Sequence, residues 1–239
     1  MRSLVTATLL GTALVLVAGC TAFPDPNPRP DQADHDNQVG DDDLEDPVSV
    51  DRGSADDATL SLTGRATSIT IGTDAPAGDL LEVHATGPDA RPSIDDSDDT
   101  RVVALDGGAA VVRLADDVAW TLDLSAGADT VDADLDGTTV SGLVLDGGAR
   151  SVELTLPAPD GTVAIDQRAG ADHLVLHLPD GVGARVTVTS GAGSADIDGD
   201  TTQGIGAGTV LTTEAFDEGA GHYELTVAGG LGSLTIDHG

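Results

Sequence analysis

The stretch Leu145-Asp-Gly-Gly-Ala-Arg-Ser-Val-Glu-Leu154, continued by Thr155 and Leu156, decides the fold class. Its second half, Val152-Glu-Leu-Thr-Leu156, places an apolar side chain at every second position, which is the period of a half-buried β-strand. The Asp-Gly-Gly segment before it is typical of a turn. The same alternation recurs from Leu60 onward, and no stretch has the spacing of an amphipathic helix of ten or more residues. The sequence therefore predicts an all-β fold.

These strands recur at a fixed interval. The stretch aligns with Leu105-Asp-Gly-Gly-Ala-Ala-Val-Val-Arg-Leu114 at an offset of 40 residues. Turn glycines that we take as equivalent are separated by 19, 21, 22 and 21 residues: Gly108, Gly127, Gly148, Gly170 and Gly191. A repeat of about 21 residues with two short strands predicts a single-domain β-solenoid, in which stacking covers the apolar face of each unit. A β-sandwich is the alternative.

Composition excludes several classes of function. The chain of 239 residues has 36 Asp and 6 Glu, 10 Arg and no Lys, with a formal charge of −32. Without Lys it has no P-loop, Schiff-base lysine or Ser/Lys dyad. So negative a surface repels the phosphate backbone, and the four aromatic residues offer no stacking platform, so we expect no nucleic-acid partner.

Residues 1–19 are expected to be a lipoprotein signal peptide. Arg2 precedes an apolar run from Leu4 to Val17, which at 14 residues is shorter than the roughly 20 of a membrane span. Val17-Ala-Gly-Cys20 then resembles the lipobox of bacterial lipoproteins, in which cleavage precedes a lipid-modified cysteine. Cys20 is the sole cysteine, so it is the predicted lipidation site and internal disulfides are excluded.

Residues 20–52 are expected to form a lipidated, disordered tether, because they are rich in Pro and Asp and lack apolar periodicity. Proline and acidic self-repulsion would extend this segment. The β-repeat domain is then expected over residues 53–239, with its repeat interrupted between Gly199 and Gly221.

Two acidic segments are candidate calcium sites. Asp132, Asp134 and Asp136 have the opening spacing of an EF-hand loop, but Leu143 stands where its bidentate acid is required. Asp196, Asp198 and Asp200 have similar spacing, but Gly199 stands two places before the glycine position of such a loop. A solvated acidic strand face explains both segments better. We expect no metal site or cofactor, with calcium bound between acidic turns as the alternative.

No catalytic constellation emerges from the sequence. His173 and His177 are four residues apart, which on a strand separates them by roughly 13 Å, too far to share a metal. They are expected to be outward strand residues, with Val175 between them. Trp120 is expected to be a core or cap residue, and the G-x-S-x-G elbow of serine hydrolases is absent.

The body resembles a known group of repeat domains. The segments that carry the likeness are Val118–Asp129, Leu143–Ala149, Ser151–Pro157, Arg168–Asp172 and Leu178–Val182. They are similar to the toast-rack repeat domain of bacterial envelope proteins, to β-strand-repeat adhesin-type domains, and to the C-terminal domains of cell-wall-active antibiotic response proteins. The likeness covers roughly residues 60 to 237. It implies an extracytoplasmic, membrane-associated β-repeat module and no catalytic residue.

Two functional hypotheses follow. The first is a non-catalytic binding, adhesion or scaffold module, lipid-anchored through Cys20 on the extracytoplasmic face of the cell membrane, with an envelope protein or a cell-wall polymer as partner. The alternative is a calcium-assisted β-helical polysaccharide lyase or hydrolase. Scarce basic residues disfavour that alternative, because a negative groove repels uronate substrates.

Overall fold

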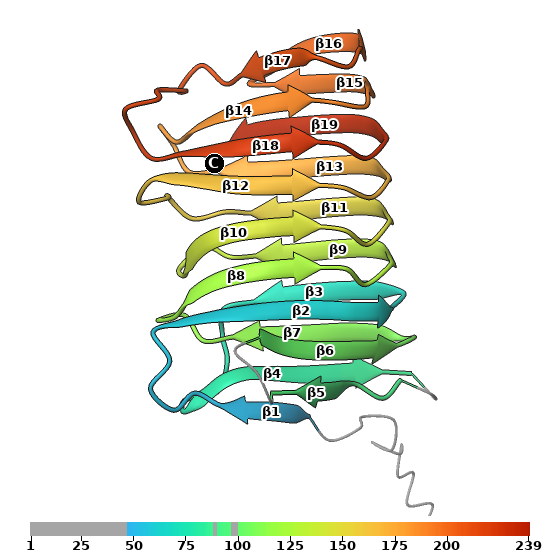
Figure 1. Ribbon diagram of the computed structural model, residues 1–239, viewed down its shortest axis with the longest axis vertical. Coiled ribbons are helices and arrows are strands. Elements are labelled where there is room, and N and C mark those ends of the chain that lie inside the picture. Colours follow the sequence, from blue (N-terminus) through green and yellow to red (C-terminus); the bar gives the residue numbers. More distant parts are fainter. Residues whose placement is uncertain (1–46, 88–89, 97–99) are drawn as a thin grey trace, which may run out of the picture. The chain divides into compact units, whose positions relative to one another are not determined.

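A computed structural model describes residues 47–87, 90–96 and 100–239, and its strands form two sheets with no helix among those residues (Figure 1). In spatial order, the ten-stranded sheet contains β1 (Val48–Asp51), β4 (Asp79–Thr86), β7 (Ala109–Leu114), β3 (Ser68–Gly72), β9 (Ala128–Asp134), β11 (Ala149–Thr155), β13 (Ala171–Leu178), β19 (Leu231–His238), β15 (Ala192–Ile197) and β16 (Asp200–Ile205). The nine-stranded sheet contains β17 (Thr209–Thr212), β14 (Gly183–Val188), β18 (His222–Val227), β12 (Thr162–Gln167), β10 (Thr139–Leu145), β8 (Ala119–Leu124), β2 (Asp57–Arg65), β6 (Thr100–Asp106) and β5 (Ser93–Asp95).

The alternation in the sequence becomes an inner and an outer face on each strand. In β8, Trp120, Leu122 and Leu124 are buried, while the residues between them are half-exposed. The inner faces of both sheets share one core, which is mainly Leu, Val, Ile and Ala. The all-β prediction is therefore confirmed.

The body is a stack of coils, where a coil is one strand of the nine-stranded sheet followed by one strand of the ten-stranded sheet. Seven coils lie in the described residues: β2/β3, β6/β7, β8/β9, β10/β11, β12/β13, β14/β15 and β18/β19. Neighbouring coils pair in parallel in both sheets. The two sheets face each other as in a sandwich, but the chain crosses between them in every coil, which is the solenoid arrangement.

The stacking order of the coils differs from their order in the chain. The first coil, β2/β3, lies between β6/β7 and β8/β9. The last coil, β18/β19, lies between β12/β13 and β14/β15, where Figure 1 shows it in red among yellow and orange strands. Gly191 follows Gly170 in the glycine series, but the amide of Ala171, next to Gly170, donates its hydrogen bond to the carbonyl of Gly230 in the last coil.

Antiparallel strands close both ends of the stack. At one end β4 and β5 pair with the coil β6/β7, and β1 pairs with β4. At the other end β16 and β17 pair with the coil β14/β15. These last two strands lie within the segment between Gly199 and Gly221, where the sequence predicted an interrupted repeat.

Two buried aromatic side chains are held by hydrogen bonds in the core. The indole Nε1 of Trp120 donates to the Ala115 carbonyl at 2.9 Å, and the Tyr223 hydroxyl donates to the Pro157 carbonyl at 2.6 Å. Burial raises the pKa of the Tyr223 hydroxyl, which therefore stays a donor. Trp120 is a core residue, as expected.

The predicted signal peptide, Cys20 and most of the predicted tether lie outside the described residues. Strand β1 begins at Val48, before residue 53, where we expected the domain to begin. In the part of the chain that the structure describes, no helix is long and apolar enough to cross a membrane.

Candidate binding site at the β16/β17 end

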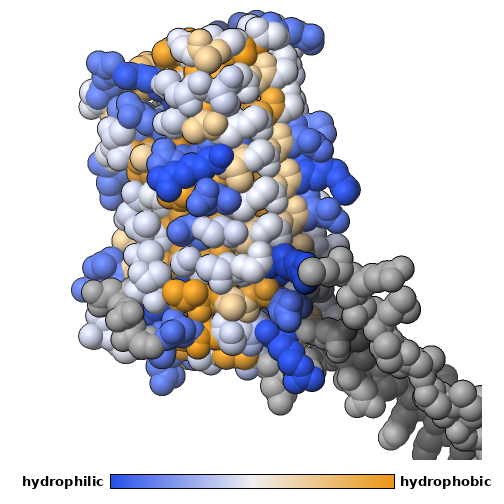
Figure 2. Space-filling model, turned by 45° about the vertical axis from the view of Figure 1, so that its right-hand side comes forward, coloured by the Kyte–Doolittle hydropathy of each residue, from blue (hydrophilic) through white to orange (hydrophobic). Residues whose placement is uncertain are grey.

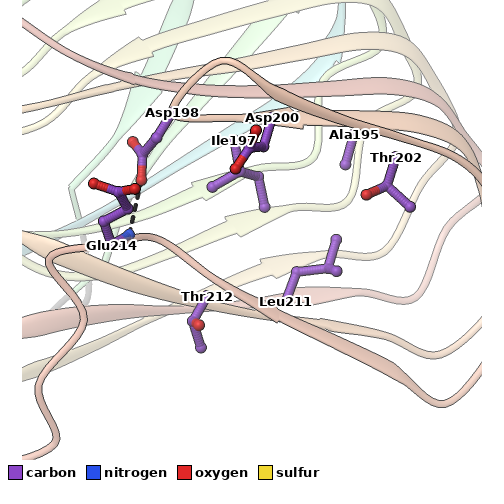
Figure 3. A pocket seen from close by; sticks show the side chains of 8 residues that line it. All are labelled: Ala195, Ile197, Asp198, Asp200, Thr202, Leu211, Thr212 and Glu214. Atoms are coloured by element: carbon purple, nitrogen blue, oxygen red, sulfur yellow. Dashed lines mark hydrogen bonds between the residues drawn. The ribbon is translucent and has the colours of Figure 1, made fainter.

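The two sheets end on β16 and β17, and a cavity of about 140 Å³ opens between these strands and β15 (Figure 3). We call this cavity the mouth. Each of the two strands has one partner, β15 for β16 and β14 for β17, so each has an edge that faces no described strand. The mouth is lined by Ala195, Ile197, Asp198, Asp200, Thr202, Leu211, Thr212 and Glu214.

The floor of the mouth is apolar because it continues the core. Ala195 and Ile197 point inward from β15 and are buried, and Leu211 contacts the core from β17. Among the described strands, no further coil covers these side chains on the open side. The floor is thus apolar surface that a ligand could cover.

The rim of the mouth is acidic at one end. Asp198, Asp200 and Glu214 gather there, as Figure 3 shows, and the other rim residues are threonines. No Arg is among the eight lining residues, and the chain has no Lys. The mouth therefore favours a cationic group over an anionic one.

A tight turn positions Asp198. Ile197 pairs with Asp200, so Asp198 and Gly199 form a two-residue hairpin loop, and both have positive φ, 54° and 85°. An Asp-Gly pair with positive φ at both residues is what a type I′ hairpin turn requires. The Asp198 carboxylate lies 2.9 Å from His238 Nδ1 and accepts a hydrogen bond from the Glu214 amide at 2.8 Å. These contacts tie β19, the β15–β16 turn and the segment after β17 together.

The calcium candidates do not converge on one point. Asp132 and Asp134 project outward from β9 and Asp136 follows in the turn, where its amide donates to Asp134 Oδ1 at 3.2 Å. In the other segment, Asp196 Oδ2 accepts from the Thr201 hydroxyl, while Asp198 and Asp200 reach the mouth. Within the described ranges, no group of three or more His, Cys, Asp or Glu is arranged to hold a metal ion.

His173 and His177 lie on the outer face of β13, as predicted, with Val175 between them. His173 Nδ1 lies 2.9 Å from the hydroxyl of Ser233. His177 sits between two carboxylates, with Nδ1 2.6 Å from Asp237 and Nε2 3.1 Å from Glu153. Partial burial lowers the pKa of His177, but the hydrogen bonds and charges of the two carboxylates outweigh it and raise that pKa above its ordinary 6.5.

The outer surface is polar in patches. Figure 2 shows one face of the described body, where hydrophilic residues form separate patches among residues of intermediate hydropathy and smaller areas of hydrophobic surface. Val210 on β17 is the one large hydrophobic residue classed as exposed among the described residues, with 56% of its surface accessible. Val210 therefore lies at the same end of the stack as the mouth.

Comparison with known proteins supports the fold. No protein-family model and no curated protein matches the chain. A solved structure described as a "putative cell adhesion protein" from Clostridium sporogenes is similar, with a TM-score of 0.61, 14% identity, and coverage of 82% of this chain and 99% of that one. A second, described as a "putative adhesin" from Bacteroides fragilis, has a TM-score of 0.27, 10% identity, and coverage of 82% and 98%. At this identity the first likeness shows a shared all-β fold.

Sequence reasoning singled out only two of the eight residues that line the mouth. Asp198 and Asp200 were singled out by their spacing, but Leu211, Thr212 and Glu214 were not. The available signal was the break in the repeat after Gly199, followed by the short run Thr209-Val-Leu-Thr212, which carries no charge. The break in the repeat lies where the stack ends, so the inner face there is not covered by another described coil.

Proposed function

We propose that this chain is a non-catalytic binding module, anchored by a lipid on Cys20 to the extracytoplasmic face of the cell membrane. The observation that carries the binding role is the mouth, where an apolar floor with an acidic rim lies beside the open edge of β17 at the end of the stack. The likeness to a structure described as a cell adhesion protein supports the same role. The Val17-Ala-Gly-Cys20 sequence supports the anchor.

The binding role fits the chemistry of the described residues better than catalysis does. A polysaccharide lyase must hold a uronate and withdraw a proton from it, which calls for basic groups or a bridging metal. The mouth offers carboxylates, threonines and aliphatic side chains. Such a site suits the recognition of a cationic or apolar surface.

Anchoring is tested by Cys20→Ser, with Thr21→Ala as the matched control beside it. In a bacterial host that processes lipoproteins, wild type and Thr21→Ala should be in the membrane fraction and should incorporate labelled palmitate. Cys20→Ser should do neither. Retention of Cys20→Ser in the membrane fraction would contradict the anchor.

A further inference from the structure

We propose that the open edge of β17 binds an extended segment of a basic partner protein by strand addition. The segment would extend the nine-stranded sheet, laying apolar side chains on the floor of the mouth and a Lys or Arg against its acidic rim. This inference rests on the proposed function of a binding module and names the class of its partner. Extended peptides are recognised in this way at exposed sheet edges elsewhere in proteins.

The backbone of β17 has groups available for such a partner. The Thr213 amide donates to the Ala184 carbonyl, and this bond shows which residues of β17 form hydrogen bonds with β14 in the antiparallel ladder. Along such a ladder, successive residues point their backbone N–H and C=O groups alternately toward the partner strand and away from it. Those of Leu211 therefore point toward β14, and those of Val210 and Thr212 point to the open side. Two residues thus offer an N–H and a C=O each to an added strand.

The β17 edge lacks the protection that the opposite end of the stack has. Exposed edges are normally defended by charge, proline or short length. At the opposite end, β1 finishes on Asp51, and β5 is three residues long and finishes on Asp95. Strand β17 is Thr-Val-Leu-Thr, without charge or proline, and it exposes Val210. The undefended edge is the one beside the mouth.

Charge selects a basic partner over a second copy of this chain. Two copies joined through β17 would bring two acidic rims together, and each chain carries a formal charge of −32. Like charges brought together at an interface oppose binding and suppress wrong partners. A Lys- or Arg-bearing segment is attracted to Asp200 and Glu214, for which no ion pair is found in the described residues.

The edge is tested with a synthetic peptide in which valine and threonine alternate between a pair of arginines at each end. Fluorescence anisotropy measures its binding to the folded chain. Val210→Pro removes an outward N–H from the open edge and leaves the ladder to β14 intact, while Val210→Ala keeps that N–H. We expect Val210→Pro to weaken binding about tenfold and Val210→Ala less than threefold. Thr212→Pro, at the other outward amide, is the second variant if Val210→Pro does not fold.

The rim is tested by Asp200→Asn with Glu214→Gln. The control pair, Asp106→Asn with Asp146→Asn, changes net charge equally at exposed sites away from the mouth. We expect the rim pair to weaken binding at least fivefold more than the control pair.

Equal effects of the two pairs, or no effect of Val210→Pro, would overturn the proposal. A dimer in sedimentation velocity that Val210→Pro abolishes would also overturn it, in favour of a second copy. Cys20→Ser fractionation tests the anchor separately from all these results.

Discussion

The position of the last coil can be tested with two glycines at the start of β19. Gly230 immediately precedes the strand and Gly232 is its second residue, and neither has a positive φ. A Cβ at Gly232 would lie 2.4 Å from the carbonyl oxygen of Asp172, on the neighbouring coil β12/β13, whereas a Cβ at Gly230 would meet nothing within 4 Å. Gly232→Ala and Gly230→Ala therefore differ in one contact, which exists because β19 lies beside β13.

The size of the effect follows from that distance. Carbon and oxygen approach to about 3.3 Å in proteins, so the backbone of one coil must move by about 0.9 Å to admit the methyl group of Gly232→Ala. Overpacking of this kind costs about 1–3 kcal/mol. Gly230→Ala should be neutral or stabilise the protein by up to about 1 kcal/mol, because alanine restricts the unfolded chain.

Thermal unfolding followed by circular dichroism measures the difference. For a chain of this size, about 1 kcal/mol shifts Tm by about 2–4 °C, so Gly232→Ala should unfold about 2–12 °C below wild type. Gly230→Ala should unfold at or slightly above the wild-type temperature. If the two variants unfold at the same temperature, β19 does not lie against β13 as described.

Two further predictions concern contacts of the last coil. Tyr223→Phe leaves the Pro157 carbonyl without its buried donor and should lower the free energy of unfolding by about 1–3 kcal/mol in urea titrations, whereas an unchanged midpoint would contradict this contact. His177→Gln tests the ion pairs of His177 with Asp237 and Glu153. Because the pKa of His177 is raised in the folded protein, these pairs stabilise the fold fully below pH 6.5, and this stabilisation is lost as the pH rises through the folded pKa. The side chains of His177, Asp237 and Glu153 are 32%, 49% and 55% exposed, so the variant should lose about 0.2–1 kcal/mol of unfolding free energy at pH 5.5 and less at pH 8. A larger loss at pH 8 than at pH 5.5 would refute this prediction.

The strands and the coil repeat were predictable because both are local. Alternation within Val152–Leu156 defines which side chains face inward, and the turn that precedes it marks where the chain reverses. These signals depend on neighbouring residues, so they can be read without the rest of the fold. The all-β solenoid follows from them.

The order of the coils was not predictable from the same signals. Each coil presents an aliphatic inner row and a small-residue turn, so the turn at Gly230 fits against Gly170 as well as the turn at Gly191 would. What selects the neighbour is long-range packing, such as His177 with Asp237 and Tyr223 with Pro157. For the same reason Glu214 could not be assigned to the mouth, because it reaches Asp198 across a separation of 16 residues.

Hydrogen exchange with and without the arginine-flanked peptide tests the central claim most directly, because it locates the bound segment on the stack. Strand addition at β17 predicts slower exchange of the Val210 and Thr212 amides, resolved by NMR, with little change along the outer faces of β9 and β13. Unchanged exchange at Val210 and Thr212, or slowing spread over the acidic outer faces, would contradict a binding site at the open edge.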